Sequence, residues 1–236
     1  MDQQENKIEE NKIASRRKFI TRASAGLVVA ALPARSVWAG ARSGSIVASG
    51  NSSLWNEGSE IQLLSHGFWK NNGNWKSTFG NNTFEDVFGT KPFDDAGNSI
   101  VIRLRREKSD GTFEFRNYQP TLKKMIGCEG NKGVVLNFNN GWEAIANSND
   151  NPTFLKVANR GPKFDLSGPS NLNVQMIAML LNAMHDGMYG LHYPMIGAGR
   201  PFADWQGYAE ELGYLAQANK FSAGTELDNL IQTYHA

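Results

Sequence analysis

Residues 174–187, Val-Gln-Met-Ile-Ala-Met-Leu-Leu-Asn-Ala-Met-His-Asp-Gly, decide the fold. The apolar residues that recur in this stretch at helical spacing are Val174, Ile177, Leu180, Leu181 and Met184. Met176 and Met179 make the remaining surface of the helix apolar as well. A helix that is apolar nearly all round is buried on most sides, so we expect other elements to pack around it. Gly187 is its expected end, because glycine readily adopts the left-handed turn that closes a helix.

Two amphipathic helices are predicted after this segment. The first follows Pro201, and its apolar positions are Trp205, Ala209, Leu212, Leu215 and Ala216. The second is expected to begin at Thr225, whose hydroxyl can cap a helix. Its apolar face is formed by Leu227, Leu230, Ile231 and Tyr234. The last third of the chain is therefore predicted to be helical.

Shorter elements are predicted upstream. Residues 83–89 read as a short helix, with Thr83 as cap, Asp86 at the reciprocal position and Gly89 as the end. Residues 120–127 predict another short helix with a glycine at its end.

Alternating apolar and polar residues indicate strands in the middle of the chain. Residues 100–105 and 113–116 alternate around a Ser-Asp-Gly turn at 109–111, which predicts a β-hairpin. Residues 133–138 and 142–146 are a candidate second strand pair. Residues 147–170 are rich in Asn, Pro and Gly and predict a long surface loop.

Together these patterns predict an α+β fold: one helix-rich domain over residues 61–236 with a small antiparallel β-hairpin element. Residues 128–170 are predicted to include an insertion.

The 236 residues contain a single cysteine, Cys128, which excludes an internal disulfide framework and an all-cysteine metal site. A formal net charge of +1 argues against non-specific binding to nucleic acid. No apolar run reaches the ~18 residues of a membrane-spanning helix, so no anchor is expected in the mature chain.

The N-terminal residues have the order of an export signal. The basic stretch Ser15-Arg16-Arg17-Lys18-Phe19-Ile20 precedes an uncharged segment, 23–34, and then Val37-Trp38-Ala39, a small-x-small peptidase site. This pattern predicts a twin-arginine signal peptide over residues 1–39. The alternative is an ordinary amphipathic helix with two surface arginines.

The expected roles within this signal follow from its parts. Arg16, Arg17 and Phe19 are the expected recognition residues, and cleavage is expected after Ala39 (alternative: Ala41). A flexible leader is expected over residues 40–60 because that stretch is rich in Ser, Gly and Ala. The expected partners are then the twin-arginine export machinery and signal peptidase, and the expected location is periplasmic or secreted.

The stretch Gly67-Phe68-Trp69-Lys70-Asn71, followed by Trp75, resembles the Gly-Tyr/Phe-Trp-Lys-Asn-His…Trp motif of a family of secreted bacterial and cell-surface proteins. The blocks that resemble the rest of that family are Val87-Phe88-Gly89, Thr121-Leu122 through Gly127, residues 178–183 and Tyr193-Pro194. The family's motif histidine is Asn72 here, so no role of that imidazole carries over, and His66 does not replace it. The resemblance implies export and fold more than mechanism.

Trp69, Lys70, Asn71 and Trp75 are the candidate ligand-binding residues. Indole faces beside amide donors and acceptors suit sugar recognition, because a sugar ring stacks on the aromatic plane while amides bond its hydroxyls. The alternative is that both indoles anchor the core and the Asn and Gly residues form the turn between them. In that alternative Lys70 pairs with a carboxylate or covers an indole face.

The histidines are the other candidate functional residues. His185 and Asp186 end the long apolar helix and His192 follows six residues later, so they are candidates for a metal site or an acid–base pair. The spacing matches no standard ligand motif, and a histidine at a helix C-terminus is also favoured by the helix dipole. No catalytic residue, metal or cofactor is therefore assigned.

Two classes of function follow. The leading hypothesis is an exported, non-enzymatic binding or structural protein of the cell envelope or extracellular space, with a surface glycan or an envelope protein as its partner. The competing class is a small exported enzyme, metal-dependent or carbohydrate-active, that uses His66, His185, Asp186 or His192.

Overall fold

The computed structural model describes residues 61–127, 134–136, 138–145, 154–158 and 161–235. The predicted signal peptide with Arg16, Arg17, Phe19 and Ala39, and the predicted leader, lie outside the described residues. The helices and strands are, in chain order, α3 (His66–Asn71), η2 (Asn74–Ser77), η3 (Phe79–Asn81), α4 (Phe84–Phe88), β1 (Ile102–Glu107), β2 (Phe113–Tyr118), α5 (Leu122–Met125), β3 (Val134–Val135), β4 (Glu143–Ala144), β5 (Phe154–Ala158), β6 (Gly161–Phe164), η5 (Pro169–Asn171), α6 (Leu172–Met184), α7 (Trp205–Ala218) and α8 (Lys220–Thr233). This composition confirms a helix-rich α+β fold.

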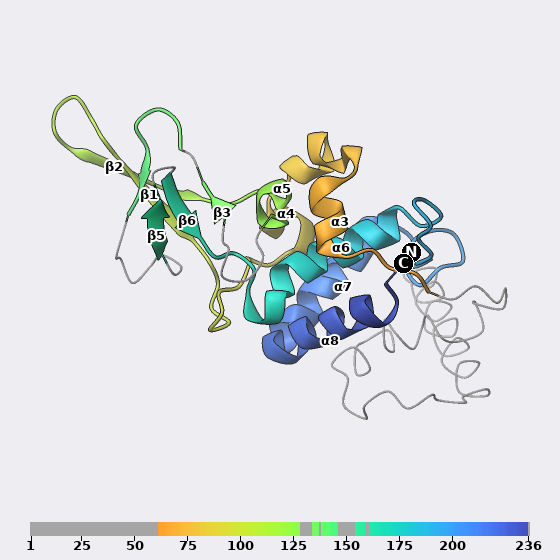
Figure 1. The fold of residues 1–236 in the computed structure, drawn as a ribbon. Helices are drawn as coiled ribbons and strands as arrows, with labels where there is room; N and C mark the ends of the chain where they lie inside the picture. The colour runs from red at the N-terminus through yellow and green to blue at the C-terminus, as the bar shows by residue number, and fades with distance from the viewer. Residues whose placement is uncertain (1–60, 128–133, 137, 146–153, 159–160, 236) are drawn as a thin grey trace, which may run out of the picture. The chain divides into compact units, whose positions relative to one another are not determined.

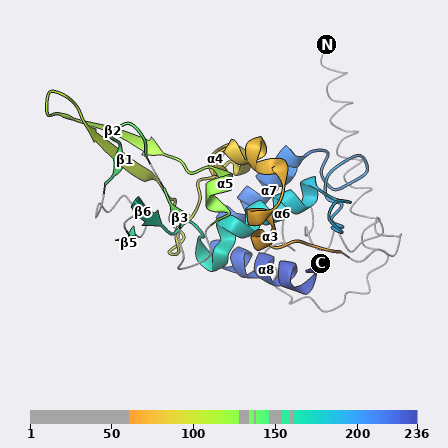
Figure 2. The same cartoon turned by 45° about the horizontal axis from the view of Figure 1, so that its top comes forward.

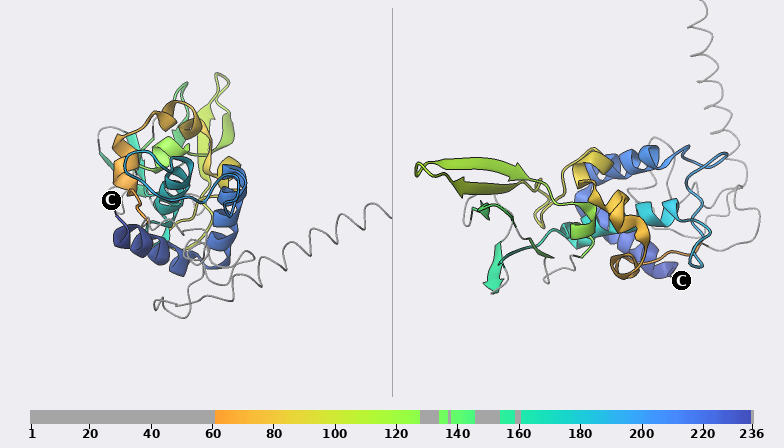
Figure 3. Two further views of the ribbon diagram at one scale, coloured as in Figure 1. Left: turned by 90° about the vertical axis from the view of Figure 1, so that its right-hand side faces the viewer. Right: turned by 90° about the horizontal axis from the view of Figure 1, so that it is seen from above.

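Helix α6 is the element around which the other helices pack. Every residue from Leu172 to Ala183 is buried, which confirms the burial predicted from its all-round apolar surface. Helices α3, α5, α7 and α8 all contact it (Figures 1 and 2). Figure 3 shows α3, in orange, and α7 and α8, in blue, on different sides of α6. The helix ends at Met184, with His185 as C-cap, so Gly187 lies in the turn that follows and is not the terminating residue.

Side chains cap the N-termini of α4 and α7, and the caps of α4 are the predicted ones. In α4 the Thr83 hydroxyl accepts a hydrogen bond from the Asp86 N–H, and the Asp86 carboxylate accepts one from the Thr83 N–H. Gly89 closes the helix in the left-handed conformation, with φ of 64°. The Asp204 side chain caps α7 by accepting a hydrogen bond from the Gly207 N–H, 2.9 Å away.

The predicted start of the last helix is wrong. Helix α8 begins at Lys220, so Thr225 lies within it, and the Thr225 hydroxyl contacts Ser170 and the Phe221 carbonyl. Helix α8 packs against η5, and Gly224 allows the close approach because a Cβ there would clash with the Pro169 carbonyl oxygen. Packing between distant segments, and not the local cap signal, therefore sets this helix boundary.

The described strands form two antiparallel three-stranded sheets, ordered β2-β1-β4 and β3-β6-β5. The predicted hairpin is present: β1 and β2 pair with Arg105 opposite Phe115, and Gly111 takes a positive φ in the turn. Two arginines of β1 form ion pairs with glutamates on the neighbouring strands. Arg105 lies 2.6 Å from Glu143, and Arg106 lies 2.7 Å from Glu114.

The second predicted strand pair is wrong. Strand β3 pairs with β6 and strand β4 pairs with β1, so the two segments belong to different sheets. The predicted loop over 147–170 contains β5 and β6, which is a further correction. Strand partners distant in sequence leave no local signal, and this explains the first error. Strands β5 and β6 pair with each other and are close in sequence, but the Asn, Pro and Gly content of residues 147–170 favoured a loop. That residues 128–170 include an insertion stays a prediction, and part of that segment lies outside the described residues.

None of the helices that the structure describes combines the length and the apolar character needed to cross a membrane.

Candidate functional site

The two tryptophans of the motif segment are core residues. Trp69 on α3 is fully buried, and its Nε1 donates a hydrogen bond to Asn182 Oδ1 at 3.1 Å. Trp75 on η2 is also buried, and its Nε1 donates to the Trp69 carbonyl at 3.2 Å. An indole with covered faces cannot stack on a sugar ring. The burial therefore corrects the prediction that Trp69 and Trp75 form a stacking surface; they are the core anchors of the alternative interpretation.

The polar residues of the same segment lie nearer the surface. Lys70 is half-buried, and its carbonyl accepts a hydrogen bond from Lys76 Nζ. Asn71 and Asn72 are exposed, and their side-chain nitrogens donate to the carbonyls of Gly67 and Phe68. Their side-chain oxygens accept no hydrogen bond from the residues that the structure describes. Both amides therefore keep acceptor capacity for a ligand.

A tight turn after α6 places an aromatic ring beside this segment. The Leu191 N–H donates to the Met188 carbonyl at 2.9 Å, so residues 188–191 form a β-turn. Both central residues have positive φ, 56° at Tyr189 and 76° at Gly190, as a type I′ turn requires. The Gly187 N–H donates to the Leu191 carbonyl at 3.1 Å, and this bond closes the turn onto the end of α6.

Tyr189 occupies a position that normally takes Asn, Asp or Gly. A bulky side chain in the left-handed region costs about 1–2 kcal/mol, because its Cβ crowds the following carbonyl. Ring contacts hold it there: the Phe68 ring centroid lies 5.5 Å away at 60°, and the Trp69 centroid lies 6.1 Å away at 83°. Backbone strain of this kind concentrates at functional sites.

The strained tyrosine is also open to solvent. Tyr189 is 51% exposed and its neighbour Met188 is 49% exposed. Asn71 is the last residue of α3, three positions after Phe68, and Asn72 is the C-cap, whose side chain donates to the Phe68 carbonyl. We call Phe68, Asn71, Asn72, Met188 and Tyr189 the aromatic surface. It combines apolar planes with amide groups, which is the combination expected of a sugar-binding site.

The structure brings two of the candidate catalytic residues, Asp186 and His192, into contact. Asp186 Oδ1 lies 3.6 Å from His192 Nδ1 and accepts a hydrogen bond from the Tyr193 N–H at 2.7 Å. His185 instead closes α6: its Nδ1 lies 2.9 Å from the Leu181 carbonyl, and its ring packs 5.0 Å from Trp69. His66 is the first residue of α3. Within the described residues, no group of three or more His, Cys, Asp or Glu is arranged to hold a metal ion.

The residues of the aromatic surface that were not among the predicted ligand-binding residues are Phe68, Asn72, Met188 and Tyr189. Phe68 stands inside the quoted motif, but the two tryptophans beside it carry the stronger aromatic signal. The Gly-Met-Tyr-Gly stretch at 187–190 indicates a turn, and a turn places its central side chains at the surface. The aromatic residue between the two glycines was therefore the signal that could have indicated an exposed ring.

No family model, curated protein or solved structure matches this chain. The resemblance to the secreted and cell-surface family stays a prediction. We therefore infer a function from the residues alone.

Proposed function

We propose that the protein is exported by the twin-arginine route and acts in the periplasm or outside the cell as a non-enzymatic binding protein for glycan. The export part is supported by the order of Arg16, Arg17, Phe19 and the Ala39 cleavage site in the sequence. Its partners in transit are the twin-arginine machinery and signal peptidase. Its partner at the destination is a surface glycan of the cell envelope.

The observation that carries the binding part is the half-exposed Tyr189 in a strained turn. A tyrosine at this position has an unfavourable backbone, and half of its surface faces water. An asparagine at this position would relieve the backbone strain and would remove the exposed ring. A stacking site needs an aromatic ring that is exposed to solvent, even where the backbone conformation that exposes it is unfavourable in free energy.

Each part of the aromatic surface has a role in this proposal. The ring of Tyr189 stacks on the apolar face of a sugar, and Phe68 supports it from the side. The side-chain oxygens of Asn71 and Asn72 accept hydrogen bonds from sugar hydroxyls. Because both asparagines donate to their own helix, their positions are set before the ligand arrives.

The test is retention on insoluble glycan. Protein purified after export is mixed with chitin, cellulose or peptidoglycan, and affinity for soluble chitotetraose or cellotetraose is measured by calorimetry. We expect Tyr189→Asn to weaken binding at least about tenfold, as for loss of an aromatic anchor. Tyr214→Ala is the matched control, because Tyr214 is 50% exposed on α7 outside the aromatic surface, and it should bind normally. Unchanged binding in Tyr189→Asn, or retention on none of the glycans, overturns the proposal.

One observation favours the competing enzyme class. Asp186 and His192 form a half-buried carboxylate–imidazole pair, the arrangement that general acid–base chemistry uses. Incubation of the protein with the same oligosaccharides tests it. Release of new reducing ends that Asp186→Asn abolishes, with binding retained, would replace the binding function with a hydrolytic one.

A further inference from the structure

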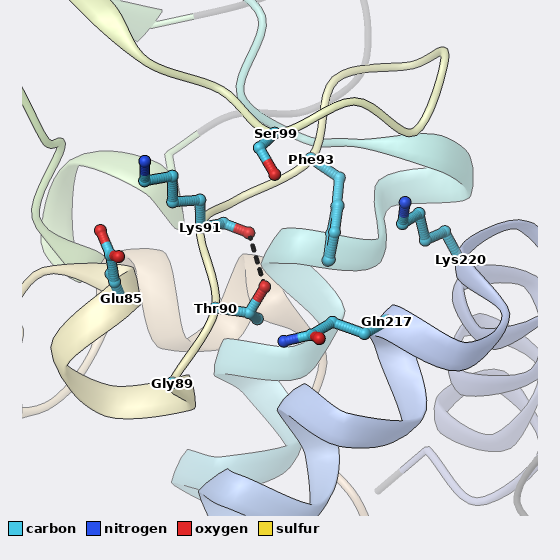
Figure 4. Close-up of a pocket in the computed structure, with 8 residues that line it drawn as sticks. All are labelled: Glu85, Gly89, Thr90, Lys91, Phe93, Ser99, Gln217 and Lys220. Atoms are coloured by element: carbon cyan, nitrogen blue, oxygen red, sulfur yellow. Dashed lines mark hydrogen bonds between the residues drawn. The ribbon is translucent and has the colours of Figure 1, made fainter.

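A cavity of about 370 Å³ opens at the end of α4 opposite α7 and α8 (Figure 4). Its lining includes Thr90, Lys91, Phe93, Ser99, Gln217 and Lys220, together with Glu85. None of them belongs to the aromatic surface. Its volume falls in the range of small-molecule sites, about 300–1,000 Å³.

Phe93 forms the floor of the cavity, and hydrogen bonds hold its backbone in place. Phe93 is only 2% exposed, and both of its backbone groups bond to one buried side chain. The Phe93 N–H donates to Asn173 Oδ1 at 3.0 Å, and Asn173 Nδ2 donates to the Phe93 carbonyl at 2.7 Å. A backbone bridge sets Ser99 opposite Phe93. The segment is thus shaped before any ligand binds, and a rigid site pays less ordering entropy on binding.

Two ammonium groups flank this floor. Figure 4 shows Lys91 and Lys220 on either side of Phe93, and Lys220 Nζ lies 5.2 Å from the Phe93 ring centroid. Lys220 comes from the first residue of α8, whose start is joined to the end of α7 through Asn219 alone. Within the described part of the chain, neither lysine forms an ion pair.

The only carboxylate among these lining residues is that of Glu85, and it accepts a hydrogen bond from Gln119. Two lysines against one glutamate leave the cavity with one excess positive charge.

Neutral polar groups complete the lining. Thr90 is buried, and its hydroxyl donates to the Lys91 carbonyl at 3.3 Å, which holds the backbone of Lys91 in place. Ser99 and Gln217 add a hydroxyl and an amide from the other walls. These groups can bond the oxygens of a ligand whose charge the lysines balance.

We propose that this cavity is a second binding site, for a small solute that carries an anionic oxygen group, a carboxylate or a phosphate. Lys91 and Lys220, which lie on either side of Phe93, attract the anionic group by their positive charge, and Thr90, Ser99 and Gln217 bond the polar remainder of the solute. This goes beyond the proposed function, because the site shares no residue with the aromatic surface.

Calorimetry on the exported protein at low salt tests the proposal, with glucuronate, inorganic phosphate and neutral glucose as probes. We expect an anion to bind and glucose not to bind, and the two anion arms show which group the site takes. Lys91→Gln and Lys220→Gln should each weaken anion binding about tenfold, the effect of one charge-assisted hydrogen bond. Glu85→Gln should tighten binding, and added salt should weaken it.

Lys108→Gln is the matched control, because Lys108 is an exposed lysine in the hairpin turn. It should leave anion binding unchanged, as should Tyr189→Asn, so failure here is distinct from failure of the glycan proposal. Absence of anion binding by the folded protein overturns the inference. So does glucose binding as tight as glucuronate, or anion binding that both lysine variants retain.

Discussion

Asn182 and Leu64 are joined by two hydrogen bonds between the side-chain amide of one and the main chain of the other. The amide nitrogen of Asn182 donates to the Leu64 carbonyl at 3.0 Å, and its oxygen accepts from the Leu64 N–H at 3.1 Å. The same oxygen also accepts the Trp69 indole N–H. The Asn182 side chain thus makes the two hydrogen bonds to the Leu64 backbone that a neighbouring strand would otherwise make. These bonds fix the segment that leads into α3.

Replacing Asn182 with leucine should destabilise the protein strongly. The substitution keeps the volume but leaves two backbone groups and one indole N–H buried without partners, at about 1–3 kcal/mol each. We expect the free energy of unfolding, measured by urea titration, to fall by at least about 3 kcal/mol. Asn229→Leu, at an exposed position on α8, is the control and should change it by less than about 0.5 kcal/mol. A loss as small as that in Asn182→Leu would show that the amide is not structural.

Tyr189→Asn should leave stability almost unchanged while it removes the ring that we propose binds glycan. Relief of the left-handed strain contributes about 1–2 kcal/mol, and loss of the ring contacts with Phe68 and Trp69 costs about 0.5–1.5 kcal/mol. These opposite effects should cancel to within about 1 kcal/mol in a chemical unfolding curve. Gly190→Ala, next to it, has no strain to relieve and should destabilise the protein by about 1 kcal/mol. A large loss in Tyr189→Asn would mean that the ring serves packing.

Two glycines of α7 should respond in opposite ways to alanine. A Cβ on Gly213 would lie 1.9 Å from the Phe88 carbonyl oxygen, so α4 and α7 would have to separate. We expect Gly213→Ala to lower the unfolding free energy by about 1–3 kcal/mol or more. Gly207→Ala, in the same helix, meets nothing closer than 3.5 Å and should raise it by up to about 1 kcal/mol. Equal thermal midpoints for the two variants would contradict this packing.

The protein should lose stability above pH 10. Tyr193 and Tyr208 are buried with their hydroxyls 3.0 Å apart, and burial raises the pKa of both above the ordinary value of 10.0. Above that pH the unfolded tyrosines release protons and the folded ones do not, so the unfolded state is favoured and stability falls until the folded pKa values are passed. Tyr193→Phe and Tyr208→Phe should each make this fall shallower in unfolding midpoints measured between pH 9 and pH 12. A profile of the same slope in both variants would assign the alkaline loss to other groups.

Export should depend on both arginines of the signal. The twin-arginine route recognises the guanidinium pair, so the double substitution Arg16→Lys and Arg17→Lys should keep the protein in the cytoplasm as precursor. Fractionation of cells and the mass of the processed chain measure this. Normal processing at Ala39 in the double variant would indicate a different export route.

Several elements could be predicted from the sequence because their signals are local. The capping box of α4 involves residues three positions apart, and the hairpin turn needs only Gly111 between two alternating strands. The all-round apolar surface of α6 also predicted its burial without any knowledge of what covers it. In each case the deciding contacts are made within a few residues or follow from hydrophobicity alone.

The sequence by itself determined that the chain has a helical core built on α6 and carries a segment rich in aromatic and amide residues. Only the tertiary structure decided which aromatic ring faces solvent. Asn182, far along the chain, draws Trp69 into the core, and the turn after α6 then places Tyr189 on the outside. The strand partners of β3 and β4 and the start of α8 depend on distant segments in the same way. Whether a side chain is buried, and which strand pairs with which, depends on the segments that pack against it. The residues next to it in the sequence do not determine this.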